Sequence, residues 1–403
     1  MCTKKMLIVV GLIVISVACI PSTALAVRGV TDTEIRLGAI VDLTGPAATH
    51  GKVLSEAMRI YVSHINDQGG INGRKINLFI EDNAYQPLKT VQAFNFLVAQ
   101  KKVFSIFNVQ GSTPFLSIMP LAKKKELPLG PSLVGTQLAF DPPKKFVFGS
   151  VTSERGDALI AMQYATAHSD KKRPKVAIFY QEDEFGKDGL RGIKEGAKFY
   201  DYEFVAAEPF KRGSMDFSSQ AMNLKKAAPD IVYMSCIFPP AGSLMKETYR
   251  LGWKPQFVGC YVSNDPRIAD VAGPAAKGLI TTNMWARSNE KIPAIQNLRR
   301  LVKKYAPQMD NEKTLRDFSI MWSMANTMVM VEGLKKAGRQ LTVESFIKGM
   351  ESLHGYATGL MAPFYYGPNL RRGAAGYGRI NKLDLEKKDF VPVTDWFKPK
   401  AIK

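Results

Sequence analysis

Residues 35 to 83 constrain the fold of this chain more than any other stretch. Apolar residues alternate and then run together at 35–41, which is typical of a strand buried on both faces of a parallel sheet. A loop of small residues follows at 42–51, and apolar residues then recur at steps of three and four from 54 to 65, as in a helix. A second alternating strand ends in acidic residues at 81–83. The segment therefore predicts a βαβ unit, which binds ligands at the carboxyl ends of its strands.

Three motifs within this unit occur in a fixed order and carry a family resemblance. The chain reads LTGPAATHG at 43–51, NDQGGINGRKI at 66–76 and an acidic strand end at 81–83. In this order and spacing, the segment resembles the opening of the periplasmic solute-binding proteins of the leucine/isoleucine/valine-binding family. The resemblance covers essentially all of the chain after residue 26, and it is carried by GSTP at 111–114, LPLGPS at 127–132, FGKDGLRG at 185–192, DFSSQ at 216–220, PDIVY at 229–233 and LGWKPQFVG at 251–259.

Two series of alternating strands and helices follow one another along the chain. The first runs to a break at Asp141, Pro142 and Pro143, and the second begins at 146–148. A chain of 403 residues also exceeds what one hydrophobic core usually supports. The sequence therefore predicts an α/β fold with two Rossmann-like lobes, each a parallel sheet flanked by helices.

The resemblance implies that the chain passes three times between these lobes through a three-strand hinge, with the ligand cleft between the lobes. The expected crossings lie near residues 145–150, 280–286 and 358–364. The expected domains are residues 1–26 as a signal peptide, 27–147 plus 284–360 as the N-terminal lobe, and 148–283 plus 361–403 as the C-terminal lobe.

The N-terminus has the pattern of a secretory signal peptide. Lys4 and Lys5 precede a largely apolar run at 6–20, and a small-residue site ends at Ala26. The run is shorter than the ~20 residues that a helix needs to span a bilayer. We therefore expect cleavage after Ala26 and a soluble mature protein in the periplasm. Attachment of a lipid to Cys19 is the alternative.

Two cysteines remain after such a cleavage, and two readings of them stay open. The spacing of Cys236 and Cys260 fits the ends of two successive parallel strands, so a disulfide and a pair of buried apolar residues are both consistent with it. The chain has no CxxC pair, and its four histidines are scattered. We therefore expect neither a metal nor a cofactor.

The formal net charge of +19 raises the question of nucleic-acid binding. Lys and Arg are spread along the whole chain, and no base-stacking motif accompanies them. The basic character therefore favours anionic ligands or membrane partners rather than nucleic acid.

Ser112 and Thr113 are the first candidates for ligand binding. They follow a predicted strand and open a helix with Pro114 near its start, so their hydroxyl and NH groups lie at the positive end of that helix. Such a site suits a carboxylate, although N-capping alone would also explain these residues. In the resembled family, the serine at the place of Ser112 contacts the ligand carboxylate.

Two further segments of the first lobe carry candidates by resemblance. The loop with Ser132, Leu133 and Val134 lies one strand later, where relatives use backbone groups and a hydroxyl for the same carboxylate. His50 falls where relatives carry an aromatic side chain that covers the ligand. A solvent-exposed loop histidine is the alternative.

The second lobe contributes Phe185, Phe238 and Tyr261 to the expected site. The two phenylalanines align with aromatics that close over the ligand in the resembled family, although packing would also account for them. Tyr261 replaces the acidic side chain that pairs with the ligand ammonium in amino-acid binders. Because a buried ammonium without a carboxylate is costly, we expect a carboxylate-bearing ligand with an apolar or aromatic body and no obligatory ammonium. The exception would be a ligand whose ammonium pairs with one of the acidic side chains at 182–184.

The resemblance implies a monomeric solute-binding protein that captures a small organic ligand by lobe closure and delivers it to the membrane subunits of an ABC-type permease. An enzyme is not expected, because the sequence lacks GxSxG, HExxH and a motif pairing Cys with His. The alternatives are a ligand sensor that presents its closed form to a receptor, and a branched-chain amino-acid binder despite Tyr261.

Overall fold

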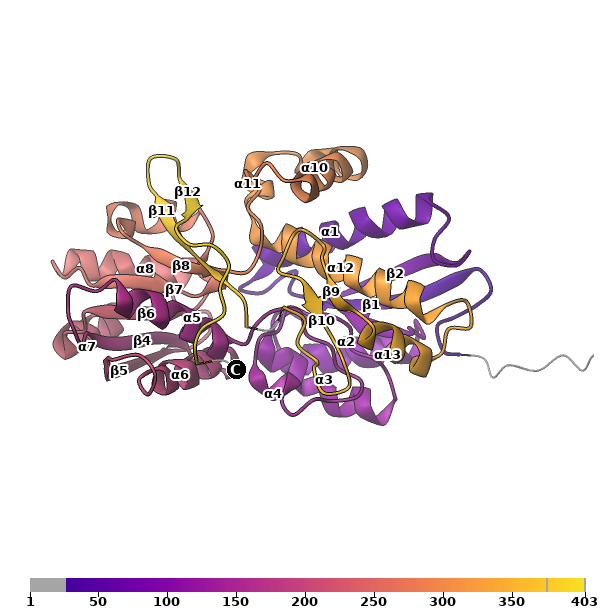
Figure 1. Ribbon diagram of the computed structural model, residues 1–403, viewed down its shortest axis with the longest axis horizontal. Helices are drawn as coiled ribbons and strands as arrows, with labels where there is room; N and C mark the ends of the chain where they lie inside the picture. The colour runs from indigo at the N-terminus through magenta and orange to yellow at the C-terminus, as the bar shows by residue number, and fades with distance from the viewer. Residues whose placement is uncertain (1–26, 375, 402–403) are drawn as a thin grey trace, which may run out of the picture.

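The computed structural model contains two α/β lobes that lie side by side along its long axis (Figure 1). It describes residues 27–374 and 376–401, so the predicted signal peptide and Cys19 lie outside the described residues. The first lobe is built around the sheet β2-β1-β3, and the second is built around a seven-stranded sheet. This arrangement confirms the α/β fold class predicted from the sequence.

The first lobe contains the predicted βαβ unit. Strand β1 lies between β2 and β3 in a parallel sheet, and bridges through Leu129 and Val147 extend this sheet in the same direction. The alternating apolar residues of β1 are buried, as a strand covered on both faces requires. The elements are β1 (Glu34–Val41), α1 (Ala48–Asp67), β2 (Lys75–Asp82), α2 (Pro87–Ala99), β3 (Ser105–Phe107), α3 (Ser112–Lys124) and the short α4 (Gln137–Phe140).

The last third of the chain returns helices to the first lobe. Helix α12 packs against both α1 and α13, and most of its residues are buried. Although α12 is long and largely apolar, no helix within residues 27–374 and 376–401 is long and apolar enough to cross a membrane. The returning elements are α10 (Pro293–Tyr305), α11 (Glu312–Leu315), α12 (Phe318–Ala337) and α13 (Val343–Glu351).

The sheet of the second lobe has the order β12-β11-β8-β7-β6-β4-β5. Strands β4 to β8 are parallel, as the sequence predicts, whereas β11 and β12 at one edge of the sheet are antiparallel to their neighbours. The reason is that a short turn joins β11 to β12, and such a hairpin can pair only antiparallel. The elements are α5 (Glu154–Ala167), β4 (Lys175–Gln181), α6 (Glu184–Gly196), β5 (Glu203–Phe210), α7 (Ser218–Ala227), β6 (Ile231–Ser235), α8 (Phe238–Arg250), β7 (Gln256–Gly259), α9 (Ile268–Ala272), β8 (Ile280–Asn283), β11 (Arg379–Asp384) and β12 (Asp389–Pro392).

The two cysteines follow β6 and β7 as expected from their spacing. Cys236 and Cys260 are buried free thiols in the structure. The thiol of Cys260 donates to the backbone oxygen of Cys236 at 3.4 Å. Of the two alternatives, the structure therefore shows two buried free cysteines and not a disulfide.

Backbone hydrogen bonds connect the segments of the chain at the predicted crossings. The amide of Gly149 donates to the oxygen of Arg371, and the amide of Gly373 donates back to the oxygen of Gly149. The amide of Ala286 donates to the oxygen of Leu360. These backbone bonds are consistent with the hinge expected from the resemblance.

A short antiparallel pair of strands forms near residue 360. Strand β10 (Phe364–Tyr365) pairs with β9 (His354–Tyr356) beside the first lobe (Figure 1). The predicted boundary at residue 360 gives β10 to the second lobe. The chain reaches the second sheet only with β11, after the hydrogen bonds made by residues 371–374. The lobe boundaries stay a prediction.

Replacing Gly51 with alanine tests how closely α1 packs on the loop before it. A Cβ at Gly51 would lie 1.7 Å from the backbone oxygen of Asp42. We expect the Gly51→Ala variant to lose about 1–3 kcal/mol of unfolding free energy, because this steric strain outweighs the helix propensity of alanine. Urea unfolding measures the change. Gly367→Ala, where no atom lies within 4 Å of the added Cβ, should match the wild-type protein, and equal stability of all three proteins would contradict the packing.

Candidate functional site

A cavity lies between the two lobes, where strands of both sheets end. The space open to the centres of water-sized spheres is about 60 Å³. Parallel α/β sheets bind ligands at this edge. The first lobe lines it with Pro46, Ala47, His50, Leu54, Tyr85, Gln110, Gly111, Ser112, Leu133, Phe318, Ser319 and Trp322, and the second with Glu154, Gln181, Phe185, Arg212, Ile237, Tyr261 and Val262.

Aromatic rings form a large part of the cavity wall. Trp285 stacks on Phe318, with ring centroids 4.7 Å apart, and on Trp322 at 5.9 Å. The indole NH of Trp322 donates to the Ser150 hydroxyl at 2.7 Å. Because Trp285 packs against both Phe318 and Trp322, these two rings present a fixed apolar surface to a ligand.

The start of α3 forms a polar part of the wall. The hydroxyl of Ser112 donates to Oε1 of Glu154 across the cleft at 3.3 Å, and the helix N-terminus adds the positive end of its dipole. Gly111 precedes the helix with φ of 101°. A Cβ on Gly111 would lie 2.8 Å from the Tyr85 ring, so glycine allows the chain to turn into α3 at this point.

Five of the predicted site residues line the cavity, whereas the hydroxyls of Thr113 and Ser132 bond to the protein backbone. Thr113 Oγ1 accepts the backbone amide of Glu184 at 3.2 Å. The hydroxyl of Ser132 donates to the backbone oxygen of Gly130 at 3.0 Å. Both hydroxyls are therefore bonded within the protein, outside the cavity wall. The five that line the cavity are His50, Ser112, Leu133, Phe185 and Tyr261, and their contact with a ligand stays a prediction.

Val134 and Phe238 also lie outside the cavity wall. Val134 is fully buried in the apolar core of the first lobe. Phe238 lies edge-on to the ring of His50, with centroids 5.8 Å apart, and beneath the guanidinium of Arg267 at 4.7 Å. These two predicted residues therefore support the surroundings of the cavity by packing.

Sequence reasoning missed Glu154, Arg212 and Trp322 in this wall. Glu154 follows Ser153, whose hydroxyl caps α5 by accepting the amide of Gly156 at 3.0 Å. The pair thus has the appearance of an ordinary helix start. Trp322 belongs to the buried helix α12, and Arg212 belongs to a loop. No local pattern indicates that these side chains meet at the cleft.

Glu154 is a buried carboxyl group in the wall of the cavity. Its Oε1 accepts the phenol of Tyr261 at 3.1 Å as well as the hydroxyl of Ser112. Its Oε2 is buried and has no hydrogen-bond partner among the described residues. Burial, with the negative charges of Asp188 and Asp157, raises the pKa of Glu154 well above its usual range. The neutral form of this carboxyl group is therefore favoured more than it is in an exposed glutamate.

Asp157 lies one turn further along α5, behind the cavity wall. Its Oδ2 accepts the phenol of Tyr233 at 2.7 Å and the backbone amide of Tyr261 at 3.4 Å. Burial is the main cause that raises the pKa of Asp157 to about 7. Two neighbouring acids of the second lobe thus hold protons at pH values where exposed carboxyl groups have lost them.

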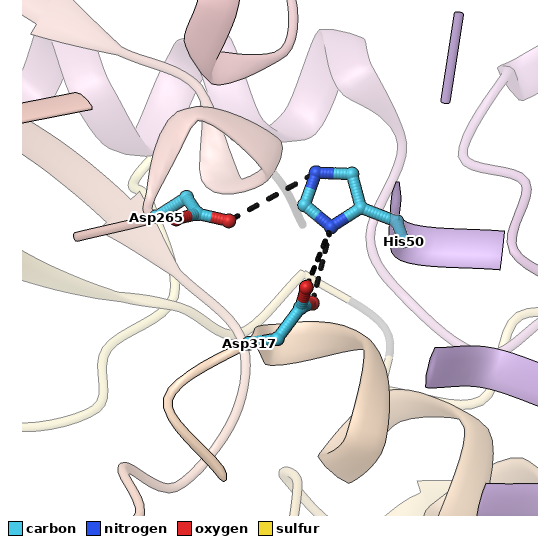
Figure 2. A group of neighbouring side chains, drawn as sticks. All are labelled: His50, Asp265 and Asp317. Atoms are coloured by element: carbon cyan, nitrogen blue, oxygen red, sulfur yellow. Dashed lines mark hydrogen bonds and ion pairs between the residues drawn. The ribbon is translucent and has the colours of Figure 1, made fainter. Parts of the chain in front are cut away.

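An ion cluster formed by His50, Asp265, Arg267 and Asp317 joins the lobes beside the cavity. Figure 2 shows the His50 ring between the two carboxylates. Nδ1 of His50 lies 3.1 Å from Oδ1 of Asp317, and its Nε2 lies 3.9 Å from Oδ2 of Asp265. The guanidinium of Arg267 bonds both carboxylates, with 2.7 Å to Asp317. His50 is therefore a buried member of an interlobe cluster rather than an exposed loop residue.

The charged groups of the cluster shift one another's pKa values. Burial by itself would raise the pKa of Asp317, but the charges of His50 and Arg267 lower it below its usual range. The pKa of Arg267 is raised, since Asp265 and Asp317 outweigh the effect of burial. His50, Asp265 and Asp317 offer ligand atoms within 4.8 Å of one another. The guanidinium of Arg267 supplies one positive charge beside the two carboxylates, and Nε2 of His50 has no hydrogen-bond partner among the described residues.

Comparison with known proteins identifies relatives of the same architecture. The family model described as periplasmic binding protein matches residues 34–378. The Leu/Ile/Val-binding protein homolog 1 of Brucella suis biovar 1 (strain 1330) is 25% identical over 263 residues, which cover 65% of this chain and 70% of the relative. The Leu/Ile/Val-binding protein of Escherichia coli (strain K12) is 25% identical over 273 residues, with the same two coverages.

Solved structures agree with this chain over most of its length. A branched chain amino acid ABC transporter structure from Thermus thermophilus with bound valine has a TM-score of 0.84 at 20% identity, over 93% of this chain and 98% of the other. A fatty acid ABC transporter substrate-binding protein from Thermomonospora curvata has a TM-score of 0.81 at 25% identity, over 93% of this chain and 95% of the other.

Two α/β lobes that enclose a small-molecule cavity define a two-lobed solute-binding protein. The matched family model covers most of the chain. The chain belongs to the periplasmic binding protein family, as the sequence resemblance predicts. It is accordingly a solute-binding protein and not an enzyme.

Asp157→Asn tests the buried proton on α5. The wild-type Asp157 carries a raised pKa of about 7, so its contribution to stability is fully present below the unfolded-state pKa near 4 and is lost as pH rises through 7. The two pKa values differ by the equivalent of about 4 kcal/mol. We expect the wild-type protein to lose stability between pH 4 and pH 8, and the variant to lose less.

Urea unfolding across this pH range measures the difference. Glu344→Gln removes a carboxylate whose side chain is 69% exposed and serves as the control. Parallel pH profiles for the wild type and Asp157→Asn would contradict the assignment of a proton to Asp157.

Proposed function

We propose that this protein captures a small carboxylate-bearing solute between its lobes and delivers it to the membrane subunits of an ABC-type permease. The observation that carries the proposal is the cavity itself, in which Ser112 and the N-terminus of α3 face residues of the opposite lobe. A hydroxyl donor and a helix N-terminus together suit a carboxylate. His50, Leu133, Phe185 and Tyr261 are the further ligand-contact candidates that line this cavity.

The remaining wall favours a ligand with an apolar body. Phe318 and Trp322 present rings from one lobe, and Phe185 presents a ring from the other. The names of the relatives support the same chemistry, since valine, leucine, isoleucine and fatty acids all combine a carboxylate with an aliphatic part. An aliphatic or aromatic acid therefore fits both the carboxylate site at Ser112 and the apolar part of the wall.

Lobe closure about the hinge is the mechanism that we propose for capture. Several polar contacts cross the cleft, including the hydroxyl of Thr136 donating to Glu184 at 2.8 Å and the guanidinium of Arg212 lying 4.4 Å from the Tyr85 ring centroid. A ligand that touches both walls adds its contacts only when the lobes are together. At a micromolar Kd it supplies about 8 kcal/mol, enough to shift an open-closed equilibrium almost completely.

The cellular setting of this proposal follows from the family and the N-terminal sequence. We infer a monomer that is exported by a signal peptide comprising residues 1–26 and that works in the periplasm without nucleic acid. A sensor that presents its closed form to a receptor uses the same cavity and remains the second candidate. Neighbouring genes for a permease and an ATPase would favour transport, whereas a neighbouring receptor gene would favour the sensor.

Ser112→Ala tests the carboxylate site. We expect 4-methylpentanoate and 3-phenylpropanoate to raise the melting temperature of the wild-type protein, and their amides to do so much less. Removing the hydroxyl should weaken binding of the acids about 10- to 100-fold, the effect of a lost hydrogen bond to a charged group.

Ser117→Ala on the same helix is the matched control, since its hydroxyl bonds the oxygen of Pro114 at 2.6 Å, away from the cavity. Titration calorimetry of the three proteins gives the affinities. Equal binding of acids and amides, or full affinity of Ser112→Ala, would count against a carboxylate at this place.

A further inference from the structure

We propose that Arg267 and Asp317 form a latch that holds the two lobes together with or without a ligand, although neither side chain lines the cavity. The two are positioning residues, because they act on a ligand only by keeping the lobes closed around it. The inference rests on the lobe closure of the proposed function, but it does not depend on the identity of the ligand.

The first-lobe half of the latch is fixed within its own lobe. Asp317 caps helix α12, since its Oδ1 accepts the backbone amide of Ser319 at 3.0 Å. Nδ1 of His50, on α1, lies 3.1 Å from the same oxygen, and the His50 ring packs on Phe318 with centroids 4.6 Å apart. Helices α1 and α12 also pack against each other. The carboxylate therefore keeps its orientation without a contact from the second lobe.

The second-lobe half of the latch is fixed in a similar way. Nε of Arg267 donates to Oδ1 of Asp265 at 2.8 Å, and Nη2 of Arg267 bonds the other oxygen of the same carboxylate. The guanidinium also lies over the Phe238 ring of α8, 4.7 Å from its centroid. A forked pair of hydrogen bonds and an aromatic face together hold a guanidinium in one orientation. One hydrogen atom of Nη2 is left for a partner on the other lobe.

Closure joins the two halves through one short contact. Nη2 of Arg267 donates to Oδ2 of Asp317 at 2.7 Å, and the side chains are exposed by only 20% and 2%. A hydrogen bond between two charged groups is stronger than a neutral one, and it is stronger still where little water reaches it. Because each side chain is already ordered within its own lobe, forming the contact costs little side-chain entropy.

The other charges of the ion cluster oppose this attraction only in part. Asp265 and Asp317 repel each other across the cleft, and burying charges is costly. Burial by itself would lower the pKa of Arg267, but Asp265 and Asp317 raise it. Burial would likewise raise the pKa of Asp317, but His50 and Arg267 lower it. Both shifts have the direction that a net attraction between the two halves of the latch produces.

The latch adjoins the cavity wall on both sides. In the first lobe, Asp317 directly precedes Phe318, which lines the cavity. In the second lobe, a short segment leads from Tyr261, also in the wall, to Arg267. Opening the latch therefore separates two parts of the wall from each other. A bound ligand leaves after this separation, so the latch slows dissociation.

Small-angle X-ray scattering of the ligand-free mature protein tests the latch by itself. Asp317→Asn keeps a side-chain oxygen for the cap of α12 and removes the charge, and Arg267→Met keeps an apolar stem. Each variant should lower the closed-to-open ratio about 10- to 100-fold, the effect of a lost hydrogen bond between charged groups. The radius of gyration should therefore increase. Arg250→Met, which removes an exposed partner of Glu247 within the second lobe, is the control and should scatter like the wild type.

Stopped-flow fluorescence of 4-methylpentanoate release gives a second readout, for which Trp322 in the cavity wall supplies the signal. We expect Asp317→Asn and Arg267→Met to release this acid about 10- to 100-fold faster than the wild type, without a slower association. The double variant should release it no faster than the single variants, because the two side chains act through one contact. Arg267→Lys keeps the charge but not the fork, so it should restore only part of the slow release.

The outcomes separate the latch from the proposed function. Urea unfolding shows whether each variant is folded, and a local structural defect would lower the fraction of binding-competent protein rather than speed release. If 4-methylpentanoate does not bind the wild-type protein, the proposed ligand class fails, and scattering still decides the latch. If folded Asp317→Asn and Arg267→Met both scatter like the wild type, or if their effects on release add up in the double variant, the latch is overturned.

Discussion

Pairing of buried charges is the interaction on which the closed arrangement of the lobes depends. Arg267 of the second lobe bonds Asp317 of the first as well as its own neighbour Asp265. Removing charges from water is costly unless each finds a partner in good geometry. The two lobes therefore fit together in an arrangement that completes the ion cluster, and this arrangement also brings Ser112 to Glu154.

The cavity differs from the ion cluster in the state of its acid. In the cluster, the guanidinium and His50 keep Asp317 ionised and leave little for a ligand to add. In the cavity, Glu154 accepts the hydroxyl groups of Ser112 and Tyr261, and burial raises the pKa of its carboxyl group.

The sequence predicts those features that depend on residues close together in the chain. The alternating residues of β1, the small-residue loop and the periodicity of α1 indicate the βαβ unit, and the family motifs indicate two lobes and the start of α3 at Ser112. Whether His50 is exposed depends on Asp317, which lies 267 residues away. Such a contact leaves no local pattern, since it is created only when α12 returns to the first lobe.

The reading of Tyr261 illustrates the same limit. Its phenol leads the sequence to predict a ligand without an obligatory ammonium, but the cavity wall also contains the carboxyl group of Glu154. Glu154 stands more than a hundred residues earlier and meets Tyr261 through folding. Likewise, Phe238 matches the expected aromatic pattern and yet packs beside the ion cluster, because the geometry after β6 directs it there.

The central claim is that one ligand contacts both lobes at once, and hydrogen exchange tests it most directly. The amides of residues 111–116 in the first lobe and of residues 153–157 in the second can be followed by mass spectrometry with and without the tightest-binding acid or amino acid. The account predicts that both segments gain protection together, in the same ligand concentration range. Protection confined to one lobe, or located away from both segments, would contradict a ligand held between them.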